Sequence, residues 1–161
     1  MLRVMGRVTV GVLVTAAGCG TVDLLGGLDV ETPDPPANGI TVQLVNLHPT
    51  AAVDIELFVS DSAVTDFDTE LFTDANRVEN LGFAGTGFVP RREAETITFS
   101  CGEAVVIGTS GPRFVDPDSN ELLGTGEQRI LERDATFSCG DVIVFEFEEI
   151  GGSFVTRLSI E

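Results

Sequence analysis

The sequence predicts an all-β fold, a single antiparallel β-sandwich of about eight or nine short strands. Apolar and polar residues alternate with a period of two along many short stretches, which is typical of strands with one buried face. Glycine, proline and aspartate, which favour turns, separate those stretches. About 120 residues share this pattern, which is a normal size for one hydrophobic core.

The first part of the pattern contains two strand candidates and one segment of a different kind. Residues 40–44 alternate strictly, and residues 53–59 place their aliphatic side chains at every second position. His48, Pro49 and Thr50 lie between them and predict a turn. Residues 61–80 lack strand character. Two apolar residues four apart among acidic ones fit one or two helical turns there, or equally an irregular acidic crossover.

Strand-like stretches then continue to residue 160. Residues 97–101 alternate, and residues 103–109 are rich in valine and isoleucine and bounded by glycines. An Asp-Pro-Asp-Ser-Asn run at 116–120 separates two short apolar pairs, so a hairpin is predicted there. The last stretches lie at 130–139, 143–147 and 154–160. This spacing favours an immunoglobulin-like or jelly-roll-like sandwich.

A short motif occurs twice, 38 residues apart. Thr-Phe-Ser-Cys-Gly-Glu at 98–103 returns as Thr-Phe-Ser-Cys-Gly-Asp at 136–141, each time before a stretch rich in valine and isoleucine. In both copies the cysteine lies two residues after the phenylalanine, and residues two apart in a strand point to the same face. Both sulfurs are therefore expected to point to the core. Two copies are too few for a repeat array. We interpret the repetition as structural.

The N-terminal residues carry the pattern of an export signal. Arg3 and Arg7 precede an apolar run at 8–17, and Ala16-Ala17-Gly18-Cys19 follows it. The run has about ten residues, and a helix that spans a bilayer needs about twenty. The sequence therefore predicts a secretory signal rather than a transmembrane helix.

A cysteine directly after three small residues resembles the lipobox of bacterial lipoproteins. The resemblance implies that Cys19 is acylated, that residues 1–18 are removed, and that the protein associates with a membrane through the covalent lipid. Residues 19–38 then form a tether rich in glycine, proline and acidic residues, which is expected to hold the domain away from the membrane. Residues 39–161 form the sandwich domain. The alternative is an ordinary signal peptide followed by an unmodified Cys19.

The number of cysteines supports the lipoprotein interpretation. The chain has three cysteines, and acylation of Cys19 leaves Cys101 and Cys139 as an even pair in an oxidising compartment. The sequence therefore predicts one disulfide between Cys101 and Cys139 in the core of the sandwich. The alternative is two buried free thiols that act as small apolar side chains.

The charge of the chain excludes one class of partner. Its formal net charge is −17, and it contains no lysine, tryptophan or tyrosine. Phosphate backbones repel such a surface, so nucleic-acid binding is rejected. Anionic lipid headgroups repel it as well, so membrane association is expected to come from the lipid on Cys19.

The sequence shows no catalytic constellation. His48 is the only histidine, and its place in a turn predicts a solvent-facing side chain rather than a catalytic base or a zinc ligand. No serine lies in a Gly-x-Ser-x-Gly elbow. Sugar sites are commonly built with tryptophan or tyrosine, which this chain lacks. We therefore expect a protein that is not an enzyme and needs no cofactor.

Calcium is the one cofactor that the sequence leaves open. Asp116, Asp118 and Asn120 have the spacing of three oxygen ligands in an EF-type loop, although Glu121 replaces the glycine of the sharp turn. The alternative is an ordinary hairpin tip. A second acidic cluster is either a cation site or a solvated loop. It consists of Asp61, Asp66, Asp68, Glu70 and Asp74.

These observations together predict a lipid-anchored protein of the bacterial cell envelope. Its exported domain is expected to be a non-enzymatic binding or structural module with an unknown ligand or protein partner. The alternatives are a calcium-binding envelope domain that uses the acidic loops and, third, an envelope hydrolase.

Overall fold

The computed structural model describes residues 38–82 and 87–161. The predicted signal peptide, Cys19 and the tether up to residue 37 lie outside these described residues. Apart from one helical turn, its regular secondary structure consists of strands, which confirms the predicted all-β class. Its elements are β1 (Gly39–Asn46), β2 (Ala52–Asp54), β3 (Leu57–Ser60), η1 (Phe67–Leu71), β4 (Phe88–Val89), β5 (Ala94–Ser100), β6 (Val106–Thr109), β7 (Arg113–Val115), β8 (Leu122–Thr125), β9 (Arg129–Glu132), β10 (Val142–Ile150) and β11 (Ser153–Ile160).

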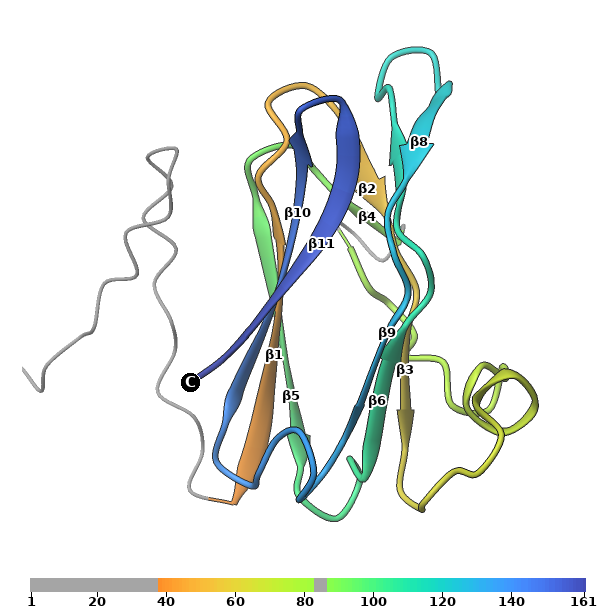
Figure 1. Cartoon of the computed structure of the whole chain (residues 1–161), viewed down its shortest axis with the longest axis vertical. Helices are drawn as coiled ribbons and strands as arrows, with labels where there is room; N and C mark the ends of the chain where they lie inside the picture. The colour runs from red at the N-terminus through yellow and green to blue at the C-terminus, as the bar shows by residue number, and fades with distance from the viewer. Residues whose placement is uncertain (1–37, 83–86) are drawn as a thin grey trace, which may run out of the picture.

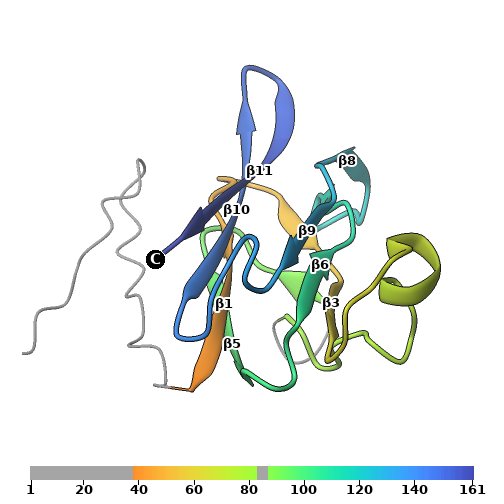
Figure 2. The ribbon, with the colours of Figure 1, turned by 60° about the horizontal axis from the view of Figure 1, so that its bottom comes forward.

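The strands form a sandwich of two layers (Figure 1). One layer is a sheet with the order β11-β10-β1-β5. The other layer contains two smaller sheets, β4-β2-β7-β8 and β3-β6-β9, which lie end to end along it. Figure 2 shows the same two layers from below, with the hairpin of β10 and β11 extending beyond the rest of the sandwich.

The core lies between the layers because alternate side chains of each strand point inward. Leu44 of β1 and Phe145 of β10 meet Val53 of β2, Ile107 of β6 and Phe114 of β7 in one buried cluster, and each of the five is fully buried. The period-two pattern predicted a buried face for Leu44, Val53 and Phe145. Ile107 and Phe114 lie in apolar stretches to which the pattern assigned no face.

Two features of the strands differ from the prediction. β1 and β10 run parallel, with Thr41 beside Val142, whereas all other neighbouring strands are antiparallel. The predicted stretch 53–59 is two strands, because the chain passes from one small sheet to the other at Ile55, whose N–H bonds to Gly87. The alternation of apolar and polar residues does not reveal where a strand passes from one sheet to another. β4 has too few residues to show any alternation. For these two reasons the structure has more strands than predicted.

Residues 61–80 contain one helical turn. η1 is a five-residue π-helical turn, and Asp66 caps it by accepting a hydrogen bond from the N–H of Asp68. Leu71 is fully buried and packs with Phe58 of β3. The segment is therefore a crossover with one helical turn. Among the described residues, no helix has the length and apolar character needed to cross a membrane.

Candidate functional site

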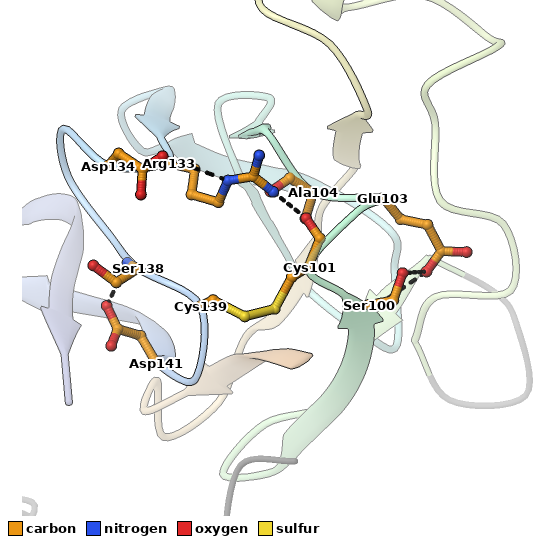
Figure 3. The surroundings of a disulfide bond; sticks show 9 residues. All are labelled: Ser100, Cys101, Glu103, Ala104, Arg133, Asp134, Ser138, Cys139 and Asp141. Carbon is orange, nitrogen blue, oxygen red and sulfur yellow. Dashed lines mark hydrogen bonds and ion pairs between the residues drawn. A yellow bond between two sulfur atoms is a disulfide. The ribbon is translucent and has the colours of Figure 1, made fainter. Parts of the chain in front are cut away.

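Cys101 and Cys139 are joined by a disulfide in the structure, with their Cα atoms 5.6 Å apart (Figure 3). The expectation that both sulfurs face the core was wrong: Cys101 is half-buried and Cys139 is exposed. Cys101 follows the last residue of β5, and Cys139 lies in the turn before β10. Side chains alternate between the two faces only within a strand, and this alternation stops at a turn. The inward direction of the two phenylalanines therefore did not predict where the cysteine side chains point.

Both copies of the repeated motif form a turn closed by their acidic residue, although Gly140 has a φ of 100° and Gly102 has no positive φ. The carboxylate of Glu103 accepts hydrogen bonds from the N–H and hydroxyl of Ser100, at 2.9 and 2.7 Å. Asp141 likewise accepts from the N–H of Ser138 at 2.6 Å. The hydroxyl and N–H of Ser100 hold the pKa of Glu103 below its usual value. The repetition is therefore structural, since each copy closes a turn that presents a cysteine.

The disulfide lies across the start of β1. The N–H of Cys101 donates to the carbonyl of Asn38 at 3.2 Å, and the N–H of Gly140 donates to Gly39 at 2.8 Å. Arg133 supports the same turn by donating from Nη1 to the carbonyl of Cys101 (Figure 3). The first residues of the domain are thus held between the two cysteine turns. We call this end of the sandwich the proximal end.

The loop proposed as an EF-type site is closed by its own aspartate. Asp116 accepts hydrogen bonds from the N–H groups of Asp118 and Ser119, at 2.8 and 2.9 Å. The N–H groups of Ser119 and Asp118 hold the pKa of Asp116 below its usual value. Asn120 follows in a left-handed conformation with φ of 57°. This is the geometry of a hairpin tip, in which the aspartate stabilises the turn.

Carboxylates of the second acidic cluster also form contacts with neighbouring residues. Glu70 accepts from the N–H of Thr65 at 2.9 Å, and this contact is the main cause that lowers its pKa. Asp74 forms an ion pair with Arg77 at 3.2 Å. Within 38–82 and 87–161, no three histidine, cysteine or acidic residues come together in a group that could hold a metal ion.

His48 is buried, with 5% of its surface exposed, so the prediction of a solvent-facing side chain was wrong. Its Nδ1 accepts hydrogen bonds from the N–H groups of Ala51 and Thr50, at 2.8 and 3.2 Å. Nδ1 therefore carries no proton, and Nε2 is 3.2 Å from Glu149 of β10. Both ring nitrogens are engaged and neither faces a nucleophile, so His48 organises a turn rather than a reaction.

The ring of His48 joins a cluster that closes one end of the sandwich. It stacks on Phe154 of β11 with centroids 5.9 Å apart, and Phe154 meets Phe114 of β7 at 4.6 Å. A methyl group at Gly124 would collide with the ring of Phe154, so β8 needs glycine where it approaches β11. The sequence held no signal for this cluster, because its members come from four different elements.

We expect His48→Ala to lower the free energy of unfolding by about 2 kcal/mol, because the buried N–H of Ala51 would lose its acceptor. The matched variant is His48→Asn, whose side-chain oxygen can take the place of Nδ1. It should lose less stability than the alanine variant. Denaturant unfolding of the three proteins measures the difference. Equal midpoints for His48→Ala and the unchanged protein would contradict this role.

Exposed apolar residues lie at the end of the sandwich opposite to the proximal end. Among the described residues the exposed large apolar side chains are Leu122, Leu123 and Ile150, at 49%, 44% and 45%. The two leucines begin β8, an edge strand, and Ile150 lies at the tip of the β10–β11 hairpin. Figure 1 shows both elements at the end away from the start of β1. We call this end, together with loops 47–51, 90–93 and 116–121, the distal end.

A groove of about 400 Å³ lies beside these leucines. Its lining is mainly apolar and includes Phe88, Pro90 and Val115, with Arg91 and Asp118 on its walls. Val115 pairs with Leu122, so the groove and that leucine share the outer face of the same sheet.

Arg91 and its neighbour Arg92 are exposed, and Arg92 has a left-handed φ of 56°. Every other described arginine forms an ion pair with a carboxylate; these are Arg77, Arg113, Arg129, Arg133 and Arg157. Within the described residues, Arg91 and Arg92 are therefore the arginines whose charge is not neutralised by such a pair. The distal end combines exposed apolar surface, a groove and free positive charge on a strongly acidic chain.

Comparisons with known proteins find likeness to solved structures. No protein-family model matches the chain, and no curated protein matches it. The fold is similar to the crystal structure of the T6SS lipoprotein TssJ1 from Pseudomonas aeruginosa, with a TM-score of 0.42 and 12% sequence identity. The likeness covers 78% of this chain and 98% of that chain. At this TM-score and identity it carries no argument about function.

Proposed function

We propose that this chain is a lipid-anchored, non-enzymatic module of the bacterial cell envelope that binds a protein partner through its distal end. The observation that carries the proposal is the placement of Leu122, Leu123 and Ile150, which lie at the end opposite to the start of β1. A chain anchored at Cys19 enters the domain at the proximal end, so its distal end would be free to meet a partner.

The chemistry of the distal end supports a protein partner. Exposed apolar side chains beside a groove are typical of protein interfaces. An edge strand such as β8 can also accept a further strand from a partner. Arg91 and Arg92 add charge that attracts carboxylates, whereas the rest of the surface is acidic.

The proposal is tested with a double variant, Leu122→Asp/Leu123→Asp. Both side chains are exposed, so folding should be retained while two charges enter the apolar surface. We expect at least a tenfold loss of the partner recovered by crosslinking in intact cells, because central interface residues typically contribute 1–2 kcal/mol or more each.

The matched control adds the same two charges at the proximal end through Gly102→Asp/Ala135→Asp. Both positions are exposed, and a side chain at Gly102 would meet open space. The control should recover the partner at the level of the unchanged protein. If the two double variants recover it equally well, the partner binds elsewhere and the assignment to the distal end is wrong.

A further inference from the structure

The loop between β1 and β2, residues 47–51, is held closed by side chains. Nδ1 of His48 accepts hydrogen bonds from the N–H groups of Ala51 and Thr50, at 2.8 and 3.2 Å. Asn46 holds the same loop, because its Nδ2 donates to the carbonyl of Ala51 at 2.9 Å. Both backbone groups of Ala51 thus bond to side chains, and its N–H depends on one nitrogen of the imidazole ring.

These contacts decide where the ring can take up a second proton. A neutral imidazole has one donor nitrogen and one acceptor nitrogen. Since Nδ1 is the acceptor, Nε2 carries the hydrogen and donates it to Glu149 at 3.2 Å. A further proton can therefore add only at Nδ1. There it would face the N–H groups of Ala51 and Thr50, so three donors would meet without an acceptor.

The surroundings of the ring also disfavour a positive charge. His48 is 5% exposed, and its ring lies against Phe114 of β7 and Phe154 of β11, with centroids 5.8 and 5.9 Å away. Burial among apolar side chains penalises the charged form of an imidazole. The closed loop therefore requires a neutral ring.

The charged groups of the packed elements do not reverse this requirement. Among the described charged side chains, Glu149 of β10 is the one that contacts the ring. Arg113 of β7 pairs with Asp54, and Arg157 of β11 pairs with Glu148. Glu149 is 42% exposed, so water screens its attraction for a charged ring, and it already receives the Nε2 hydrogen of the neutral ring.

We propose that loop 47–51 is a pH-sensitive switch, in which protonation of His48 at Nδ1 releases the loop from β7, β10 and β11. Histidine is the side chain that gains a proton between about pH 8 and pH 5. The open loop can bind this proton and the closed loop cannot. The stability of the closed loop is therefore present at neutral and higher pH and is lost as the pH falls.

Opening of the loop would change the distal end, of which loop 47–51 is a part. The hydrogen bond to Glu149 joins the loop to the hairpin whose tip carries Ile150. The same ring covers part of Phe154. Its release would free the hairpin tip and expose more of Phe154, so the binding surface would differ between neutral and acidic medium. This consequence rests on the proposed function, whereas the switch itself does not.

The first experiment follows the ring and the loop by NMR in the chain with Cys19→Ser, at pH values between about 8 and 5. Imidazole nitrogen shifts report which ring nitrogen carries a proton, and we expect Nε2 alone at the alkaline end and both at the acidic end. The amide of Ala51, corrected for the pH dependence of intrinsic exchange, should lose at least about tenfold in protection as the ring is protonated. The amide of Phe145 in β10 should keep its protection.

The matched control is His48→Asn, whose side-chain oxygen can accept from Ala51 and does not titrate in this range. Its Ala51 amide should be equally protected at both ends of the range. Glu149→Gln keeps the acceptor at Nδ1, so the loss of protection should persist in that variant. The proposal is overturned if His48 of the unchanged protein is protonated while Ala51 stays protected. An equal loss in His48→Asn, or no loss in Glu149→Gln, would also overturn it.

A second experiment tests the consequence for binding. The partner is recovered by crosslinking in intact cells held at about pH 8 or about pH 5. Recovery should fall several-fold in acid for the unchanged protein and should not change for His48→Asn. Equal recovery curves for the two proteins would show that the loop does not regulate binding. Failure of the distal-end assignment itself is recognised separately, from the Leu122→Asp/Leu123→Asp variant, and leaves the NMR result on the loop as it stands.

Discussion

A variant with serine at both Cys101 and Cys139 is expected to lose about 3–4 kcal/mol of the free energy of unfolding relative to the disulfide-bonded protein. The bridge closes a loop of 38 residues, which contains β6, β7, β8 and β9 of the second layer. In the chain-entropy model a loop of this length restricts the unfolded chain strongly. The loss is large beside the roughly 5–15 kcal/mol that stabilises a typical domain.

The position of the bridge adds a local expectation. Because Cys101 and Gly140 bond to Asn38 and Gly39, the first residues of β1 should exchange amide hydrogen faster in the serine variant. The N–H of Thr41, which donates to Asp141 in the same region, should respond in the same way. Amides in the centre of β10, such as that of Phe145, should change only with global stability. Hydrogen exchange followed by mass spectrometry separates the two effects.

The measurement is denaturant unfolding of the exported protein with and without a thiol reductant. Reductant should destabilise the unchanged protein by the same amount as the double substitution and should leave the double variant unaffected. The double serine variant is the control, because it lacks the disulfide and has no free thiol at either position. Non-reducing peptide mapping that recovers both cysteines as thiols, together with no effect of reductant, would show that the bridge does not form in the exported protein.

The period of the hydrophobic pattern predicted the sandwich well because burial in a strand repeats every two residues. Leu44 and Phe145 occupy core positions for this reason. The same rule failed for Cys139, since the residue lies in a turn where no period applies.

The candidate site was harder to predict because it is made by contacts between distant segments. Sequence position placed His48 in a turn, but its burial depends on Phe114 and Phe154. Leu122 and Leu123 look like any short strand in the sequence, and only the strand order leaves them at an edge. The hairpin tip at Asp116 was the alternative that turn chemistry favoured, because the aspartate bonds to N–H groups two and three residues later.

The second large effect concerns the lipid anchor. We expect substitution of Cys19 to abolish membrane association rather than to weaken it. Cys19→Ser should move the protein out of the lipid-anchored membrane fraction, because serine cannot receive the acyl chains. In the unchanged protein the attachment is hydrophobic, and each buried methylene of an acyl chain contributes about 0.8 kcal/mol. Detergent should therefore release the unchanged protein, and high salt should not. With a formal net charge of −17, the chain is repelled overall by anionic headgroups, so attraction that salt could screen is not expected to hold it at the membrane.

The control for this experiment is the Cys101→Ser/Cys139→Ser variant, which keeps Cys19 and should stay in the membrane fraction although its domain is less stable. Intact mass spectrometry completes the test, since the mature N-terminus should begin at Cys19 and carry the mass of the attached lipid. A mature N-terminus upstream of Cys19, or a protein that salt alone extracts, would contradict lipid anchoring. The disulfide and the distal end would then belong to an exported domain without an acyl anchor, and both could still be tested on the unlipidated chain.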